Sequence, residues 1–271
     1  MKKFMIMAAA VMVSLSVNAQ SSPEAKAIKK MKSYTEVLEA IKANGASFDK
    51  ADNAFAYNKL VDLAISENSK TEKAAIEAQL AKNAEQQAQM TNAKNAAAYN
   101  ALQAAMQCNA FDEKGKYKNK NVNRLMTIRN SMVQAGLDAY NTKDYESATK
   151  YFGAFVETRT DALFNEADFS REQNFGQIAY YAALAAYFNK DYAKCDQYAD
   201  AALNSSERDS IANDVIIVKL GAYEEQAKTA VMDSATYVKN VRAMYDQFPE
   251  NENIFGKLVG LYEETGDKAS A

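Results

Sequence analysis

Beyond Val122 the apolar residues recur at the three- and four-residue spacing of helices that bury one face. The segments come in pairs, and a short polar turn divides the two members of each pair. Each turn ends in an aspartate that can accept hydrogen bonds from the free amides of the next helix: Asp144, Asp191, Asp233 and Asp267. The pattern predicts four helical hairpins over residues 122–271, the last of them incomplete.

One stretch of this region occurs twice. The segment NTKDYESATKYF, residues 141–152, aligns without a gap with FNKDYAKCDQYA, residues 188–199. A small residue, Ala148 or Cys195, follows the aspartate by four positions and lets the two helices of the hairpin approach closely. A tyrosine precedes the aspartate by four positions and supplies apolar area. Because one hairpin cannot bury its apolar face alone, the repetition predicts that successive hairpins stack.

This arrangement resembles the tetratricopeptide repeat (TPR). The residues that carry the resemblance are Gly136, Tyr140, Asp144, Tyr145, Ala148 and Phe152 in one copy, Ala183, Tyr187, Asp191, Tyr192, Cys195 and Ala199 in the next, and Tyr262, Gly266, Asp267 and Ala271 at the end. The resemblance implies an all-α fold in which the hairpins form a right-handed α-solenoid. The two clear copies lie 47 residues apart, whereas the family period is about 34. The excess falls in residues 157–175, where we expect an extended connector or a helical extension. The unfinished last hairpin favours a fragment of a longer array, and a last helix that packs by other means is the alternative.

The segment before the hairpins, residues 20–107, is rich in alanine and glutamine and is predicted to be helical. Residues 70–107 favour an antiparallel spacer that packs through alanine and breaks near Thr91. Degenerate helical hairpins are the alternative, because AYNKL before this stretch is echoed by AYNAL within it. Residues 108–121 contain Gly115 and alternating lysines, which predicts a solvated loop at the main domain boundary. The lysines could instead hold an anionic group.

The first 19 residues have the order of a secretory signal peptide. Lys2 and Lys3 precede an apolar run, and small residues before Gln20 suit a signal peptidase. The apolar run is short for a bilayer span, and no cysteine follows the cleavage site for lipid attachment. We therefore expect an exported, periplasmic protein with no stable membrane anchor, and an uncleaved anchor is the alternative. With the repeats, this start is similar to that of the exported TPR proteins common in Bacteroidetes.

Composition agrees with a helical fold and excludes some partners. Nine Gly and two Pro are too few for a turn-rich β architecture. Without the signal peptide the formal charge is −5, from 30 basic and 35 acidic residues, so we expect no nucleic-acid partner. An oxidising compartment permits a Cys108–Cys195 disulfide. The equivalence of Cys195 to Ala148 instead favours a small buried side chain.

The chain has no histidine, which excludes the usual Ser-His-Asp and Cys-His nucleophile systems and zinc sites built from His and Cys. No glycine-rich phosphate loop or EF-hand spacing is present. We therefore predict a non-enzymatic protein with no cofactor and no metal. Paired carboxylates, as in glycan cleavage, are the remaining route to catalysis. The candidate acids crowd the connector, where solvated side chains are the favoured interpretation: Glu157, Asp161, Glu166 and Asp168.

The resemblance also implies a binding site, because the first helices of successive TPR hairpins line a concave groove for a peptide or a partner helix. The residues that map to this groove are Asn130, Val133, Leu137, Tyr140 and Asn141 from one hairpin and Gln177, Tyr180, Leu184, Tyr187 and Phe188 from the next. Val133 and Leu137 replace the polar groups of a carboxylate clamp, so the groove suits an apolar or tyrosine-rich segment, or a sugar ring. For Leu184 and Phe188 packing between helices is the favoured interpretation, and for Tyr187 packing and groove binding both stay open.

Three functions stay open on this evidence. The favoured one is a periplasmic scaffold that binds a protein or peptide partner of the cell envelope in the groove. The second is a glycan-binding or weakly glycan-cleaving envelope protein. The third is a structural envelope component that associates with itself.

Overall fold

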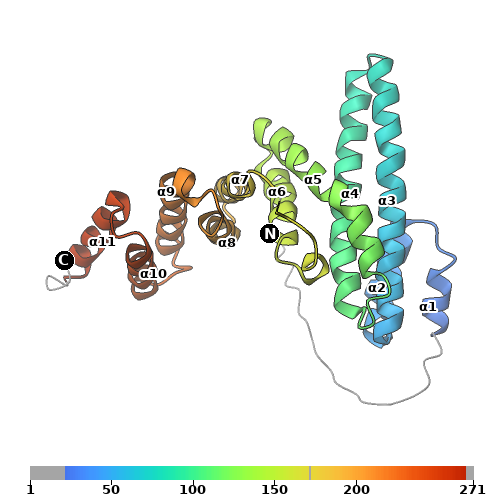
Figure 1. The fold of residues 1–271 in the computed structure, drawn as a ribbon, viewed down its shortest axis with the longest axis horizontal. Coiled ribbons are helices and arrows are strands. Elements are labelled where there is room, and N and C mark those ends of the chain that lie inside the picture. The colour runs from blue at the N-terminus through green and yellow to red at the C-terminus, as the bar shows by residue number, and fades with distance from the viewer. Residues whose placement is uncertain (1–21, 171, 267–271) are drawn as a thin grey trace.

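The computed structural model describes residues 22–170 and 172–266. Within these ranges the chain forms eleven α-helices and two short 3₁₀-helices, with no β-strand. The all-α prediction is therefore confirmed, and the helices pack as hairpins (Figure 1). The predicted signal peptide and the capping role of Asp267 lie outside the described residues.

The N-terminal part is built on one long antiparallel hairpin. Its elements are α1 (Pro23–Ile28), α2 (Tyr34–Asn44), η1 (Gly45–Ser47), α3 (Lys50–Leu80) and α4 (Ala84–Phe111). In Figure 1, α3 and α4 stand side by side, and α1 and α2 cover the lower part of α3. Small residues line the contact, as the alanine-rich sequence predicts: Ala56, Ala64, Ala98, Ala101 and Ala105 are all buried. Ile76 and Leu80, in the last turns of α3 next to the hairpin tip, are exposed.

The hairpin turns earlier than the sequence indicates. The expected break near Thr91 is wrong, because Thr91 lies inside α4 and the chain reverses at Ala81–Asn83. Lys82 adopts a left-handed φ of 55°, and the Asn83 side chain accepts a hydrogen bond from the Gln86 amide at 3.1 Å. A left-handed residue and a capping side chain together stop one helix and start the next.

The lysine-rich loop is shorter than the predicted 108–121. Helix α4 continues to Phe111 and α5 begins at Lys118, which leaves residues 112–117 between them. Cys108 therefore lies in α4 and not in the loop. Its side chain is buried against α3, where the thiol donates to the Ala54 carbonyl at 3.2 Å. The Asp112 carboxylate accepts from two amides of the loop and makes the turn compact.

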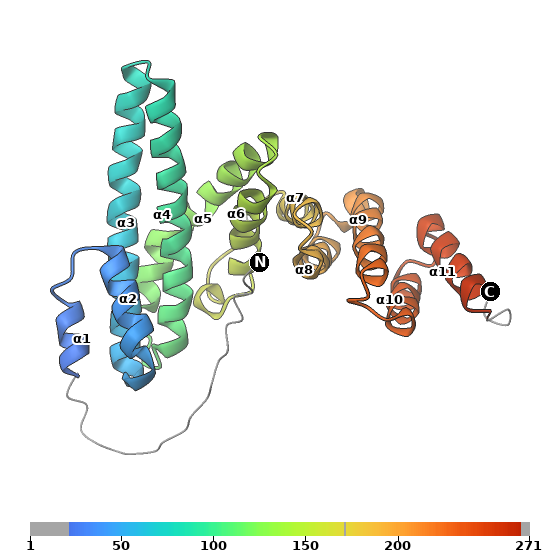
Figure 2. The ribbon, with the colours of Figure 1, turned by 180° about the vertical axis from the view of Figure 1, so that it is seen from behind.

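The rest of the described chain is a row of helices that leads away from the long hairpin (Figure 2). The elements are α5 (Lys118–Asn141), α6 (Tyr145–Thr158), η2 (Ala162–Phe164), α7 (Phe175–Phe188), α8 (Tyr192–Leu203), α9 (Arg208–Lys228), α10 (Ser234–Gln247) and α11 (Glu252–Thr265). Helices α5 and α6 form one hairpin and α7 and α8 the next, and α9 packs against both α7 and α8. Helix α10 packs on α9 and on α11.

The repeated Lys-Asp turn has the same geometry in both copies. Lys143 and Lys190 have φ values of 61° and 60°. The following aspartate amides reach back to carbonyls five residues earlier, each at 2.9 Å. Asp144 and Asp191 then accept from Ser147 and Lys194 amides at 3.1 and 3.2 Å. The predicted caps are confirmed, and Asp233 caps α10 in the same way by accepting from the Thr236 amide at 2.8 Å.

Both cysteines are free and fully buried, so the Cys108–Cys195 disulfide is not formed. Cys195 lies in α8 and Cys108 in the long hairpin, each surrounded by its own helix contacts. Burial is the main cause that raises the pKa of both thiols to about 12. The thiolate is the reactive form, and a raised pKa keeps the thiol protonated at neutral pH.

We therefore expect the two thiols to react very slowly with a disulfide reagent at pH 8 in the native protein. In denaturant both thiols of the chain should titrate at once, because unfolding removes the burial that raises the pKa. A native chain that reacts as fast as free cysteine would contradict this packing, and so would an unfolded chain with no titratable thiol.

Candidate functional site

The predicted groove residues lie on the first helices of two neighbouring hairpins. Five belong to α5 and five to α7. Asn130, Asn141 and Phe188 are exposed, whereas the other seven are half-buried: Val133, Leu137, Tyr140, Gln177, Tyr180, Leu184 and Tyr187. Each helix therefore presents a stripe that is partly open to solvent.

An aromatic cluster joins the two hairpins near their turns. We define it as Tyr140, Tyr145, Tyr181 and Phe188. The Tyr140 ring centroid lies 5.5, 6.0 and 6.5 Å from those of Tyr145, Tyr181 and Phe188. The Phe188 and Tyr145 rings are 4.8 Å apart. Tyr145 and Tyr181 were not among the predicted residues, because their part in the cluster depends on how α6 and α7 pack together.

Tyr187 has a packing role. Its ring lies against Gly221 of α9, where an added Cβ would come within 3.2 Å of the Tyr187 ring. A second tyrosine, Tyr192, has its ring centroid 5.9 Å away. Tyr187 therefore packs in the joint between α7 and α9, although part of it is open to solvent.

The connector between α6 and α7, defined as residues 159–170 and 172–174, closes one end of the predicted groove. Asn130 and Val133 line a cavity of about 390 Å³ on one side. Connector residues form the opposite wall: Asp168, Phe169, Glu172 and Gln173. The extended connector predicted from the repeat spacing is therefore present, and it folds back against α5.

A buried arginine fastens the connector. The Arg129 side chain is fully buried, although arginine is rarely buried unless it is paired. Its guanidinium donates to the Thr158 hydroxyl at 2.7 Å and to the Phe155 carbonyl at 3.0 Å. It also forms an ion pair with Glu172 of the connector. Burial lowers the pKa of Arg129, and the carboxylate of Glu172 opposes this shift.

The same carboxylate holds a second arginine. Glu172 accepts from Arg159 as well as from Arg129, so two guanidinium groups share one acid. Phe169 lies beside both cations, with guanidinium carbons 4.8 and 4.9 Å from its ring centroid. These contacts combine charge pairing with cation–π attraction. They hold the connector in one place on α5 and α6.

The face that carries the predicted residues continues along the row. The predicted groove residues hold the same positions before the left-handed residues of their turns, Lys143 after α5 and Lys190 after α7. In both helices they lie 13, 10, 6, 3 and 2 positions before that residue. Ala230 and Gly266 are also left-handed, with φ of 55° and 73°. The equivalent residues are Ile217, Leu220, Glu224, Ala227 and Lys228 of α9, and Asn253, Gly256, Gly260, Glu263 and Glu264 of α11. We call these positions of α5, α7, α9 and α11 the first-helix face.

A cavity of about 490 Å³ opens on this face between α9 and α11. Six of the equivalent residues line it: Glu224, Ala227, Lys228, Gly256, Gly260 and Glu264. A Cβ added at Gly256 or Gly260 would meet nothing within 4 Å, so the two glycines leave the space open. Sequence reasoning missed this part of the face.

Charged groups surround that cavity. Glu224 pairs with Lys228 at 2.8 Å and with Lys257 at 2.6 Å. The hydrogen bonds from these lysines lower the pKa of Glu224 to about 2. A carboxyl group whose pKa is lowered on folding stabilises the protein at pH values above its ordinary pKa. That stabilisation is lost as the pH falls toward 2. Glu224 is partly exposed, so solvent screening keeps the contribution small.

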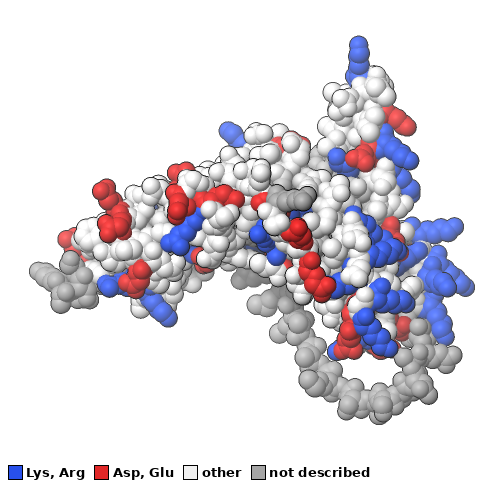
Figure 3. Space-filling view, viewed as in Figure 1, with Lys and Arg blue, Asp and Glu red and all other residues white. Residues whose placement is uncertain are grey.

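Lysines gather at the opposite end of the molecule. Figure 3 shows blue side chains clustered over α1 and its neighbours, and red side chains more frequent toward α11. Lys26, Lys29, Lys30 and Lys32 are all exposed there. These four lysines fall within residues 26–32, so they are also close in the sequence, and they lie at the far end from the α9–α11 cavity.

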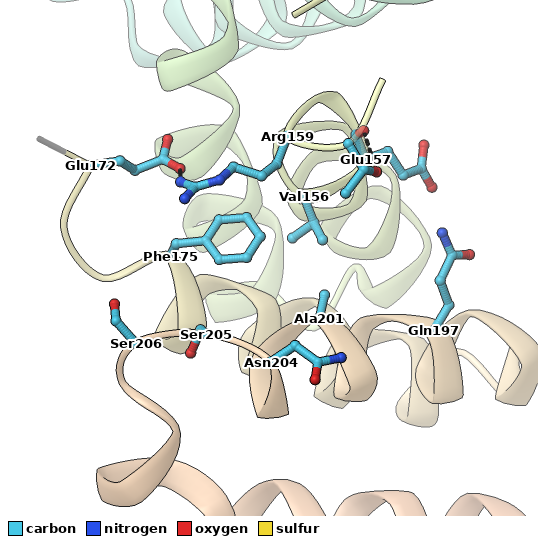
Figure 4. A pocket seen from close by; sticks show the side chains of 11 residues that line it. Val156, Glu157, Arg159, Glu172, Phe175, Gln197, Ala201, Asn204, Ser205 and Ser206 are labelled. Carbon is cyan, nitrogen blue, oxygen red and sulfur yellow. Dashed lines mark hydrogen bonds and ion pairs between the residues drawn. The ribbon is translucent and has the colours of Figure 1, made fainter. Parts of the chain in front are cut away.

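A third cavity, about 440 Å³ in volume, lies between α6, α8 and the connector (Figure 4). We call it the α6–α8 cavity. Its walls carry mixed chemistry: Val156, Phe175 and Ala201 are apolar, Glu157, Arg159 and Glu172 are charged, and Thr160, Gln197, Asn204, Ser205 and Ser206 are polar. The Glu157 carboxylate accepts a hydrogen bond from the buried Tyr198 hydroxyl at 2.6 Å.

The four candidate acids are held by structural contacts. Asp161 caps η2 by accepting from the Leu163 amide at 2.8 Å. Glu166 pairs with Lys118, whose hydrogen bond lowers the pKa of Glu166. Hydrogen bonds from Ser170 lower the pKa of Asp168. A general acid needs a raised pKa, so the shifts at Glu166 and Asp168 run opposite to that role.

Comparison with family models, with curated proteins and with solved structures found no match to this chain. In the described part of the chain, no group of three or more Asp, Glu, Cys or His side chains is placed to hold a metal ion. No helix there has the length and apolar character of a membrane span. The fold and the cavities define an all-α protein of packed helical hairpins with several possible binding surfaces.

Proposed function

We propose that this chain is a non-enzymatic scaffold of the TPR type, exported to the periplasm, which binds an extended segment of an envelope protein along the first-helix face. The observation that carries the proposal is the shared register of that face. Four left-handed turns place residues of α5, α7, α9 and α11 at equivalent positions. Those of α5 line a cavity beside the connector, and those of α9 and α11 line the cavity between these two helices. A face built from repeated positions suits an extended ligand, because each hairpin can offer the same kind of contact.

The chemistry of the face indicates the kind of segment it accepts. The aromatic cluster between the cavities offers ring surface, and Phe188 is 45% exposed there. Aromatic side chains at such positions are typical anchors for apolar or tyrosine-rich segments. The α9–α11 cavity adds Lys228, Lys257 and Glu264, which can pair with charged side chains further along the segment. The connector limits the α5 end, so the segment lies mainly across α7, α9 and α11.

Selection of peptides from a random displayed library on the purified protein tests this proposal. We expect enriched peptides rich in aromatic or aliphatic residues. Phe188→Ala should weaken their binding about tenfold, because an exposed anchor on the face is lost. Leu80→Ala is the matched control, since Leu80 is 79% exposed on the long hairpin and far along the chain from the face.

The outcome that contradicts the proposal is clear. If the selected peptides bind Phe188→Ala as tightly as the original protein while Leu80→Ala weakens them, the binding surface is the α3–α4 hairpin. Circular dichroism of each variant shows whether the helices have survived, so loss of binding through unfolding is recognised.

A further inference from the structure

The α6–α8 cavity is separate from the first-helix face. Its floor is formed by Gln197 and Ala201 of the second helix α8 and by its C-cap Asn204, which lie on one side because they are spaced four and three residues apart. Its roof is the end of the second helix α6, with Val156 and Glu157. A volume of about 440 Å³ is within the range of small-molecule sites.

The charged groups of this cavity are all held by partners within the protein. Glu172 pairs with Arg159 and with Arg129 behind it. Glu157 accepts from Tyr198, which keeps its carboxylate in place at the roof. No charged side chain in the lining is therefore without a partner, and this favours an uncharged ligand over an ion.

Two carboxamides remain free to bind. The side chains of Gln197 and Asn204 make no hydrogen bond to any other residue that the structure describes, and Figure 4 shows both rising from α8 at the cavity. A carboxamide offers two donor hydrogens and an acceptor oxygen. Together with the free lone pairs of Glu157, these groups match a ligand that carries several hydroxyl groups.

An aromatic wall completes the site. The Phe175 ring borders the cavity, and the Arg159 guanidinium carbon lies 4.8 Å from the ring centroid and holds it in position. Val156 and Ala201 extend the apolar surface. A sugar ring has hydroxyl groups at its edge and an apolar C–H face, so it can use the amides and the aromatic ring together.

We propose that the α6–α8 cavity binds a short uncharged saccharide, with Gln197, Asn204 and Glu157 holding its hydroxyl groups and Phe175 packing on its C–H face. This site goes beyond the proposed partner-binding function and does not depend on it. The two ligands use different surfaces: the saccharide lies between the second helices α6 and α8 and against Phe175 at the start of α7, and the protein segment lies along the first-helix face.

Saturation-transfer NMR on the purified protein tests the proposal with a panel of neutral sugars: glucose, galactose, mannose, N-acetylglucosamine and their common disaccharides. We expect at least one to bind, with the strongest saturation on the protons of one ring face, as stacking on Phe175 requires. Asn204→Ala and Gln197→Ala should each weaken that ligand about fivefold, since each removes hydrogen bonds to a hydroxyl group. Gln247→Ala, an exposed carboxamide at the end of α10, is the matched control and should change nothing.

A second variant separates loss of sugar binding from loss of the fold. Phe175→Leu keeps an apolar side chain and should retain the helical circular dichroism signal, but it should abolish the face-selective saturation. The proposal is overturned if no sugar of the panel binds at about 10 mM, or if glutamate or lysine competes better than any neutral sugar. The two proposals can fail separately. If no sugar binds but the selected peptides still bind the Asn204→Ala variant, the saccharide site is wrong and the first-helix face is not affected.

Discussion

Replacing Arg129 with alanine is expected to lower the free energy of unfolding by about 3–5 kcal/mol, the cost of breaking a buried ion pair. The change leaves Glu172 with a single partner and strips the Thr158 hydroxyl and the Phe155 carbonyl of their guanidinium donor. It also opens a cavity beside Phe155, whose ring lies 3.8 Å from the guanidinium carbon. Urea unfolding followed by circular dichroism measures the loss.

Arg242→Ala is the control for this prediction. Arg242 pairs with Asp246 on the surface of α10, and both side chains are more than half exposed. Exposed pairs contribute about 0–1 kcal/mol, so the two arginine variants should differ by several kcal/mol. Arg129→Lys keeps the charge but loses the planar fork of donors, and it should fall between them. A loss below 1 kcal/mol for Arg129→Ala would show that the connector is not held as described.

Phe152→Ala is expected to cost about 3–5 kcal/mol, the usual range for truncating a buried aromatic side chain. Phe152 is fully buried and its ring stacks on Tyr181 with centroids 6.0 Å apart. It therefore contributes to the joint between the α5–α6 hairpin and α7. Thermal and urea unfolding both measure this loss, and Phe255→Ala on the exposed side of α11 is the control with little expected effect.

A second substitution sharpens this test. A Cβ added at Gly136 would lie 2.6 Å from the Phe152 ring, so Gly136→Ala should destabilise the original protein by about 1–3 kcal/mol through overpacking. In the Phe152→Ala background the ring is gone, and the same change should stabilise the helix by about 0.5–1 kcal/mol. A double-mutant cycle measures this reversal of sign. Additive effects would mean that α5 and α6 do not meet at these two residues.

The turns of the repeated region were predictable because they depend on local chemistry. An aspartate after a helical segment caps the next helix through its own side chain, and Asp144 and Asp191 do so. The same signal exists at Lys82-Asn83, where lysine and an amide residue replace lysine and aspartate. High helix propensity on both sides of that pair concealed the turn, and the break was expected near Thr91 instead.

The sites were less predictable because they depend on contacts between distant residues. Nothing near Arg129 in the sequence indicates its burial, since its ion-pair partner Glu172 lies 43 residues later. The first-helix face of α9 was missed for a different reason. Its left-handed residue Ala230 lies three positions before Asp233, whereas Lys143 directly precedes Asp144. An alignment on aspartates therefore shifts the register of α9 by two residues.

Photo-crosslinking in the producing cell tests the central claim most directly, because it compares the two sides of the hairpins without a known partner. A photoreactive amino acid is placed at Gln177 or Ile217 on the first helices, and at the exposed Ala193 or Ala235 on the second helices. Our account predicts covalent adducts with a partner protein from the first-helix positions and none from Ala193 or Ala235. Adducts that form only from the second-helix positions would contradict it.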